Sequence, residues 1–162
     1  MPRTYPCLWF DTNALPAAEF YTSVFPNSRI GSISHFPKGS GEREGQVLTV
    51  AFELDGVPYV GLNGGPEFTL DEAISITIEV SDQAELDRYW DALVADGGQE
   101  SQCGWLKDKF GLSWQVVPQH WDQIATGDPA RASRVFAAML TMKRLDIAAL
   151  EAAGAGQDSL AG

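Results

Sequence analysis

The stretch SITIEVSDQAELDRYWDALVADGG, residues 75–98, contains a complete strand–helix unit and decides the fold. Apolar residues alternate along 73–80, which is the pattern of a strand with one buried face. Asp82, followed three residues later by Glu85, forms a capping box that predicts the start of a helix. Gly97-Gly98 ends that helix by allowing a left-handed C-cap. The apolar stripe of the helix consists of Leu86, Trp90, Leu93 and Val94.

A similar unit occurs 69 residues earlier in the chain. This offset places Phe20-Tyr21 on Tyr89-Trp90, Val24-Phe25 on Leu93-Val94, and Pro6 on Ser75. Gly56, in one turn, corresponds to Gly111 in a later turn. Self-similarity at one offset is the signature of a duplication, although any two strand–helix units share part of this pattern. We therefore predict two similar halves, each with a strand, a helix and then three strands.

The remaining elements follow from apolar patterns and turn residues. In the first half, Asp11-Thr12-Asn13 offers caps for a helix, and the segment 37–46 predicts a mobile loop that can act as a lid. In the second half, residues 99–105 and 112–117 are predicted strands on either side of a turn at Phe110-Gly111. The predicted strands of the first half are 6–10, 29–36, 47–54 and 58–63.

Two further helices are predicted after the second half. Asp128-Pro129 opens one that runs through Leu140, and Asp146 caps another that ends before Gly154. Their apolar residues must pack on their own domain or on a second subunit. Residues 154–162 are small and polar, which predicts a frayed tail.

Composition narrows the class of protein. With 162 residues, 44% of them hydrophobic and 20% charged, the chain is expected to form one globular domain. No apolar run approaches the roughly 20 residues of a membrane helix, and the N-terminus has no apolar signal core, so we expect a cytoplasmic protein. The net charge of −11 disfavours nucleic acid and anionic membranes as partners. It favours a neutral or cationic small molecule, or serves solubility alone.

The order and spacing of several motifs resemble the vicinal oxygen chelate, or glyoxalase and bleomycin-resistance, superfamily. The PhnB-like group, labelled 3-demethylubiquinone-9 3-methyltransferase, is the most similar. The resemblance implies an α+β fold of two βαβββ modules with curved, cup-like mixed sheets and extra C-terminal helices, paired within the chain or across a homodimer. The motifs are AAEFYTSVFPNS (17–28), GLNGG (61–65), CGWLKDKFGLSWQ (103–115), KFGLSWQVVP (109–118) and MLTMKRLDIAALEAA (139–153).

The same resemblance implies the domain boundaries. A single glyoxalase-like domain is expected over residues 1–153. Its parts are a first module at 5–63, a linker at 64–72, a second module at 73–118 and C-terminal helices at 119–153.

Metal-binding members of this superfamily hold the ion with histidine, glutamate or glutamine at four strand positions. The resemblance carries these positions to Pro6, Val60, Ser75 and Gln115, and a register slip of two brings in Leu8, Leu62 and Thr77. None of these residues is a histidine or a carboxylate, whereas a divalent ion prefers several imidazole or charged oxygen ligands. The sequence therefore predicts no metal and no cofactor.

Six residues are candidates for ligand binding, and each also has a structural interpretation. Trp9 and Trp105 are candidate pocket walls, or core residues. Asn63 can bond a ligand or serve the turn before Gly64. Cys103 is a candidate nucleophile or a small buried residue. Ser75 and Gln115 complete the set because of the strand positions they occupy. His35 and His120 lack a local catalytic partner.

These observations favour a metal-free pocket that binds a small, partly aromatic organic molecule. An enzyme is the alternative, either a methyltransferase, as the label of the group implies, or a metal-dependent lyase or dioxygenase. No strand–GxGxxG–helix segment supports a nucleotide-type cofactor site. A purely structural or regulatory dimer is a third interpretation. The sequence alone does not decide whether the protein turns over a substrate.

Overall fold

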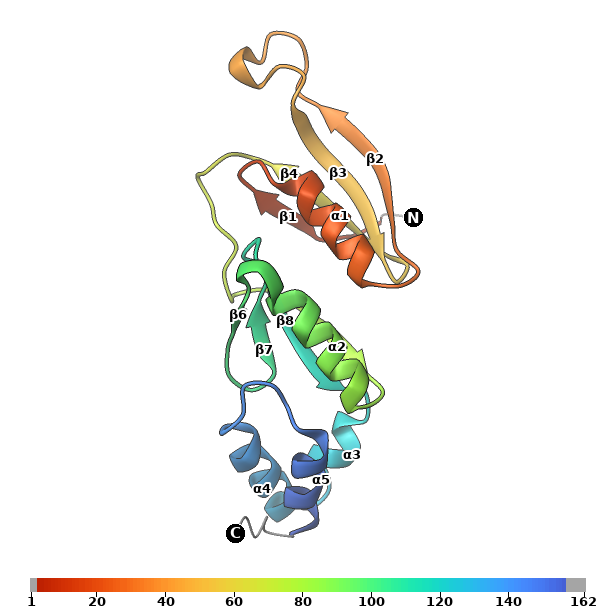
Figure 1. Cartoon of the computed structure of the whole chain (residues 1–162), viewed down its shortest axis with the longest axis vertical. Coiled ribbons are helices and arrows are strands. Elements are labelled where there is room, and N and C mark those ends of the chain that lie inside the picture. The colour runs from red at the N-terminus through yellow and green to blue at the C-terminus, as the bar shows by residue number, and fades with distance from the viewer. Residues whose placement is uncertain (1–2, 157–162) are drawn as a thin grey trace. The chain divides into compact units, whose positions relative to one another are not determined.

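The computed structural model describes residues 3–156. The chain divides between residues 70 and 71 into two compact units. Each unit contains one four-stranded mixed sheet with a helix packed on one face (Figure 1). The predicted α+β fold of two βαβββ modules with additional C-terminal helices is confirmed.

The first unit follows the predicted order of elements. β1 and β4 run parallel, and the other neighbouring strands run antiparallel, so that the order across the sheet is β1-β4-β3-β2. A short 3-10 helix, η1, lies in the loop between β2 and β3. The elements are β1 (Cys7–Phe10), α1 (Ala14–Val24), β2 (Arg29–His35), η1 (Gly41–Arg43), β3 (Val47–Leu54) and β4 (Val57–Asn63).

The second unit repeats this plan. Its first and last strands are again parallel neighbours, and the order across the sheet is β5-β8-β7-β6. The elements are β5 (Ser75–Val80), α2 (Gln83–Val94), η2 (Ala95–Gly97), β6 (Gln99–Glu100), β7 (Trp105–Lys107) and β8 (Ser113–Pro118).

Each core lies between the sheet and its helix. Tyr21 of α1 and Trp90 of α2 are both fully buried there, at the equivalent positions that the sequence repeat predicts. Since side chains alternate along a strand, every second strand residue lies on the other side of the sheet, which we call the open face. The residues buried against α1 include Leu8, Phe10, Val50, Phe52 and Leu54; those against α2 include Ile78, Val80, Leu106, Trp114 and Val116.

The offset of 69 holds for the helices and fails by one residue for the opening strands. Asn13 and Asp82 are the N-caps of α1 and α2, which are 69 residues apart. Phe10 and Val80, however, are the last buried residues of β1 and β5 and are 70 apart. The first unit has one extra residue between its strand and its helix. Pro6 therefore does not correspond to Ser75: alternation from exposed Cys7 assigns Pro6 to the helix side and Tyr5 to the open face.

The two helices begin differently. At α2 the predicted capping box is present, with the Asp82 carboxylate accepting from the Glu85 N–H at 2.9 Å. At α1 the side chain of Asn13 makes no capping bond. Instead, Asn63 on β4 accepts from the Ala14 N–H at 2.8 Å. A residue far along the chain thus supplies the cap that Asp11-Thr12-Asn13 was predicted to supply.

The predicted strand at 99–105 is wrong in its second part. Only Gln99 and Glu100 form β6, and residues 101–104 turn before β7 begins. Cys103 and Gly104 both have positive φ, at 59° and 82°, which no extended strand allows. The 37–46 loop is held at its base, where the Phe36 N–H donates to the Gln46 carbonyl at 2.9 Å.

The C-terminal helices continue the second unit. They are α3 (Trp121–Ala125), α4 (Pro129–Met139) and α5 (Ile147–Ala155). α5 continues past Gly154, where the sequence predicted its end, and Gly154 packs against Arg131. The predicted frayed tail at 154–162 otherwise lies outside the described residues. Among the described helices, none has the length and apolar character needed to cross a lipid bilayer.

Candidate functional site

The open face of the second sheet brings three of the predicted site residues together. Gln115 on β8 donates its Nε2 hydrogen to the Ser75 hydroxyl on β5 at 2.8 Å. Trp105 on β7 is the cross-strand partner of Gln115 on the other side. Because all three alternate with buried residues, they point away from α2.

Gln115 and Trp105 line a hollow of about 390 Å³, which we call the acidic hollow. Glu79 of β5 and Asp122 of α3 contribute two carboxylates, and none of the lining residues is lysine or arginine. The volume lies within the range of about 300–1,000 Å³ found for small-molecule sites. The full lining consists of Glu79, Cys103, Trp105, Gln115, Val117, Gln119, Trp121, Asp122, Met139 and Leu145.

The turn at 101–104 explains how one end of the acidic hollow is formed. The Cys103 and Gly104 N–H groups donate to the carbonyls of Met142 and Lys143, at 2.8 and 2.7 Å. A side chain at Gly104 would approach the Leu145 side chain and the Val116 carbonyl to 3.0 Å. The segment after α4 is therefore held tightly to the turn, and its Leu145 lines the hollow. Cys103 lies at the same end, partly exposed.

Trp9 and Asn63 belong to the first unit and do not join this group. Trp9 lies on the open face of β1, donates its indole N–H to the Gly65 carbonyl at 2.9 Å, and packs edge-on against Phe68. Asn63 is buried, and its amide accepts from Ala14 and donates to the Val47 carbonyl at 3.0 Å. These two bonds give Asn63 a structural role at the start of α1, and its amide oxygen and NH2 group each keep one further hydrogen-bonding position.

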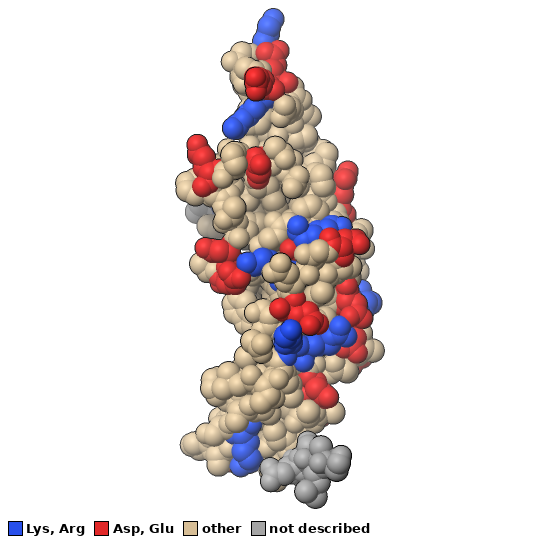
Figure 2. All heavy atoms as spheres, turned by 60° about the vertical axis from the view of Figure 1, so that its left-hand side comes forward, with Lys and Arg blue, Asp and Glu red and all other residues tan. Residues whose placement is uncertain are grey.

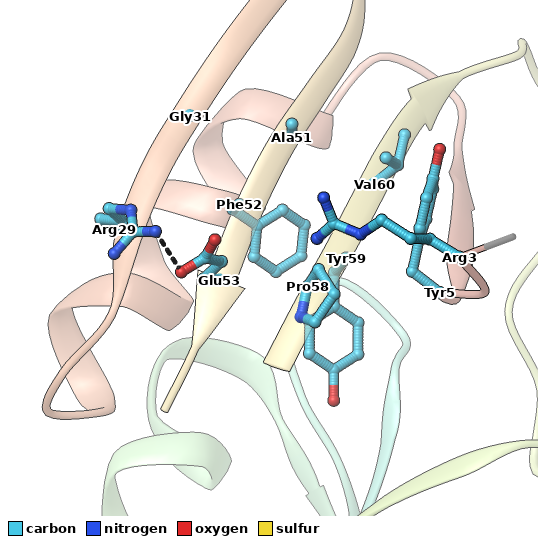
Figure 3. Close-up of a pocket in the computed structure, with 10 residues that line it drawn as sticks. All are labelled: Arg3, Tyr5, Arg29, Gly31, Ala51, Phe52, Glu53, Pro58, Tyr59 and Val60. Carbon is cyan, nitrogen blue, oxygen red and sulfur yellow. Dashed lines mark ion pairs between the residues drawn. The ribbon is translucent and has the colours of Figure 1, made fainter. Parts of the chain in front are cut away.

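The first unit has a larger hollow of its own, about 600 Å³, on the open face of its sheet. Figure 3 shows Arg3 reaching across β4 toward an ion pair between Arg29 and Glu53, with Tyr5 on the opposite side. We call it the basic hollow because its charged residues are two arginines and one glutamate. Its lining consists of Arg3, Tyr5, Arg29, Gly31, Ala51, Phe52, Glu53, Pro58, Tyr59 and Val60.

The residues at the metal positions of the superfamily do not fit a divalent ion. Val60 has no donor atom, and Ser75 and Gln115 are neutral and bonded to each other. On β1 the strand partner of Val60 is Cys7, and partial loss of water around its thiol raises its pKa, which disfavours the thiolate that binds metals. Within residues 3–156, no three histidine, cysteine, aspartate or glutamate side chains gather closely enough to hold an ion.

The charges elsewhere show no pattern typical of nucleic-acid binding on the face drawn in Figure 2, where basic and acidic side chains are intermixed.

His120 lies at the start of α3 and contacts Glu151 of α5 at 3.2 Å. His35 is exposed at the end of β2. His120 is not among the residues that line the acidic hollow.

The sequence did not single out Glu79, Asp122 or Arg3. Glu79 was open to prediction, because it alternates with Ile78 and Val80 and so lies on the same face as Ser75. Asp122 and Arg3 lie outside the strands, and no period in the sequence indicates where such residues pack.

Comparison with known proteins identifies relatives for most of the chain. The family model described as 3-demethylubiquinone-9 3-methyltransferase matches residues 2–117. A PhnB protein from Bacillus cereus is 29% identical, with a TM-score of 0.64, over 72% of this chain and 99% of its own. No curated protein sequence matches the chain.

Two more distant structures share only the fold. Protein PA1353 from Pseudomonas aeruginosa is 18% identical, with a TM-score of 0.61, over 73% of this chain and 98% of its own. The fosfomycin resistance protein FosX from Listeria monocytogenes, solved with Mn(II) and sulfate, is 17% identical, with a TM-score of 0.51, over 71% of this chain and 89% of its own. The fold is therefore that of the vicinal oxygen chelate superfamily.

Proposed function

Because the chain belongs to the 3-demethylubiquinone-9 3-methyltransferase family, we propose that it is a PhnB-like protein that binds a small organic cation in the acidic hollow, without a metal ion. One observation carries this proposal. The hollow joins two carboxylates, Glu79 and Asp122, to two indole rings, Trp105 and Trp121, with no basic residue in its lining.

This combination of groups suits a cation better than any other ligand class. An indole face attracts a cation through its quadrupole, by about 0.5–2 kcal/mol depending on desolvation. The carboxylates add Coulombic attraction in a partly enclosed space. Gln115 offers an amide oxygen to a donor on the ligand, because its Nε2 is bonded to Ser75. The net charge of −11 also favours the approach of a cation.

The test is calorimetric titration with benzyltrimethylammonium and, as an uncharged counterpart, benzyl alcohol. We expect the cation to bind at least tenfold more tightly, which corresponds to about 1.4 kcal/mol. Asp122→Asn should remove most of this preference. Asp96→Asn, which makes the same charge change at an exposed surface pair with Lys109, should preserve it. Equal binding of the two probes would contradict the proposal.

The name of the family supports a methyltransferase as the second candidate, and the same hollow offers a way to test it. S-adenosylmethionine carries a sulfonium cation, so it can be added to the same series of titrations. Micromolar binding that is lost in Asp122→Asn would favour the methyltransferase.

The metal-free part of the proposal is tested by metal analysis of protein purified without chelator. One divalent ion per chain, lost in Gln115→Ala, would overturn it.

We further propose that the protein is a homodimer and that α4 contributes to the interface. Phe136 of α4 and Leu140 at its C-cap are 57% and 53% exposed, although large apolar side chains are usually buried. They are four residues apart and so lie on one helix face. Light scattering should show a dimer at micromolar concentration and a monomer for Phe136→Asp. A monomeric wild type would contradict this proposal.

A further inference from the structure

The basic hollow of the first unit has a charge that is unusual for this protein. The chain carries a net charge of −11, yet the charged lining residues of this hollow are Arg3, Arg29 and Glu53. Arg29 Nη2 and Glu53 Oε2 are 2.6 Å apart, so these two charges largely neutralise each other. Arg3 remains. Within residues 3–156 no carboxylate forms an ion pair with it, and Figure 3 shows its guanidinium extended over the hollow.

The hollow exists because small residues form its floor. Gly31 on β2 and Ala51 on β3 are neighbours on the open face, and a Cβ added at Gly31 would lie only 3.3 Å from the Ala51 carbonyl oxygen. Larger side chains at these two positions would fill the space between the Arg29–Glu53 pair and β4. The resulting volume of about 600 Å³ accommodates a ligand of one or two rings.

The remaining walls are mainly apolar or aromatic. Tyr5 is 53% exposed and stands on the side of the hollow away from Arg29 (Figure 3). Pro58 and Val60 of β4 form the surface between them. A flat apolar body can therefore lie on β4 beside the tyrosine ring, with an anionic group at the guanidinium.

We propose that the basic hollow binds an aromatic organic anion, a carboxylate or a phosphate, through Arg3. The guanidinium is planar, stays charged at any physiological pH and matches both anions with two parallel donors. The Arg29–Glu53 pair forms the far wall and limits the length of the ligand. The basic and acidic hollows share no lining residue, so the two proposals can be tested with separate variants.

The test is calorimetric titration of the full chain with benzoate, phenyl phosphate and the uncharged benzamide. A hydrogen bond to a charged group is worth more than one to a neutral group, so we expect an anion to bind on the order of tenfold more tightly than benzamide. The tighter of the two anions identifies the headgroup class. Failure of both anions to bind more tightly than benzamide would overturn the proposal.

Two variants assign the binding to this hollow. Arg3→Gln should reduce anion binding to the level of benzamide. Arg43→Gln, which makes the same charge change in the 37–46 loop of the same unit, should leave it unchanged. Ala51→Leu should weaken all three probes by filling the floor, and circular dichroism would verify its fold. Anion preference that survives Arg3→Gln would refute the role of Arg3. Loss of cation binding in the acidic hollow would not affect these outcomes.

Discussion

The two halves of the molecule share a scaffold and differ in what their open faces carry. In the first half the open face holds Arg3 and an Arg29–Glu53 pair, and in the second half it holds Glu79 near Asp122. The faces that pack on α1 and α2 are alike: both are apolar and mostly buried. Packing against a helix constrains every second strand residue, whereas open-face residues are free to diverge after a duplication. The helix-packed faces thus show which residues the fold requires, and the open faces show which residues are available to a ligand.

The largest effect is expected where the halves are most alike. Tyr21 and Trp90 occupy the same helix position, and both are fully buried. Replacing a buried aromatic side chain by alanine removes its burial and leaves a cavity, which typically costs about 3–5 kcal/mol. We expect Trp90→Ala and Tyr21→Ala each to lower the free energy of unfolding by an amount in this range, measured by urea titration.

The control for this pair is Arg88→Ala, which changes an exposed residue of α2 two positions before Trp90. It should cost less than about 1 kcal/mol. If one aromatic substitution is severe and the other behaves like Arg88→Ala, the two cores are not equivalent, and the structural meaning of the repeat is lost.

A smaller effect should distinguish two glycine turns. Gly56 and Gly104 both have positive φ, at 79° and 82°, but only Gly104 is surrounded by other atoms. For Gly56→Ala we expect the cost of a left-handed alanine, about 1–2 kcal/mol. For Gly104→Ala we expect about 1–3 kcal/mol more, because the new methyl group meets Leu145 and Val116.

Hydrogen exchange adds a local measurement to the glycine comparison. Gly104→Ala should accelerate exchange of the Cys103 and Gly104 amides, which bond to the segment after α4. Gly56→Ala should not affect these amides. Equal losses of stability in the two variants would mean that the turn does not hold the C-terminal segment.

The sequence predicted the fold well because periodicity reports burial directly. The βαβββ order, the equivalence of Tyr21 and Trp90, and the caps at Asp82, Asp128 and Asp146 all follow from local patterns, and all are present. The errors occur where distant contacts decide. The turn at 101–104 forms because it bonds to 142–143, and α1 is capped by Asn63 rather than by its neighbours.

The site was only partly accessible to sequence reasoning. Trp105 and Gln115 lie on predicted strands and line one hollow, together with Cys103, which lies in a turn where the sequence predicted a strand. Their role in binding stays a prediction. Asp122 lines the acidic hollow because α3 follows β8 directly, and Arg3 lines the basic hollow because its side chain reaches across β4 (Figure 3). The positions of Asp122 and Arg3 depend on the path of segments outside the repeated modules. These segments have no periodic pattern from which that path could be predicted.

The smallest expected effect concerns the two helix starts. Glu85 accepts hydrogen bonds from the Ser81 backbone N–H and hydroxyl, at 2.8 and 2.9 Å, and these bonds hold its pKa below the ordinary 4.5. A lowered carboxyl pKa stabilises the folded state above the unfolded pKa, and the contribution is lost as pH falls through the folded pKa. α1 has no acidic residue in its first turn and relies on the neutral Asn63 amide.

Lowering the pH from 6 to 3 should therefore weaken the start of α2 more than that of α1, as judged by exchange of the Ser81 and Ala14 amides. Glu85→Gln should abolish the difference, whereas Glu19→Gln, on α1, should leave it unchanged. Equal sensitivity of both amides in the wild-type protein would show that global acid unfolding, rather than the capping carboxylate, controls the response.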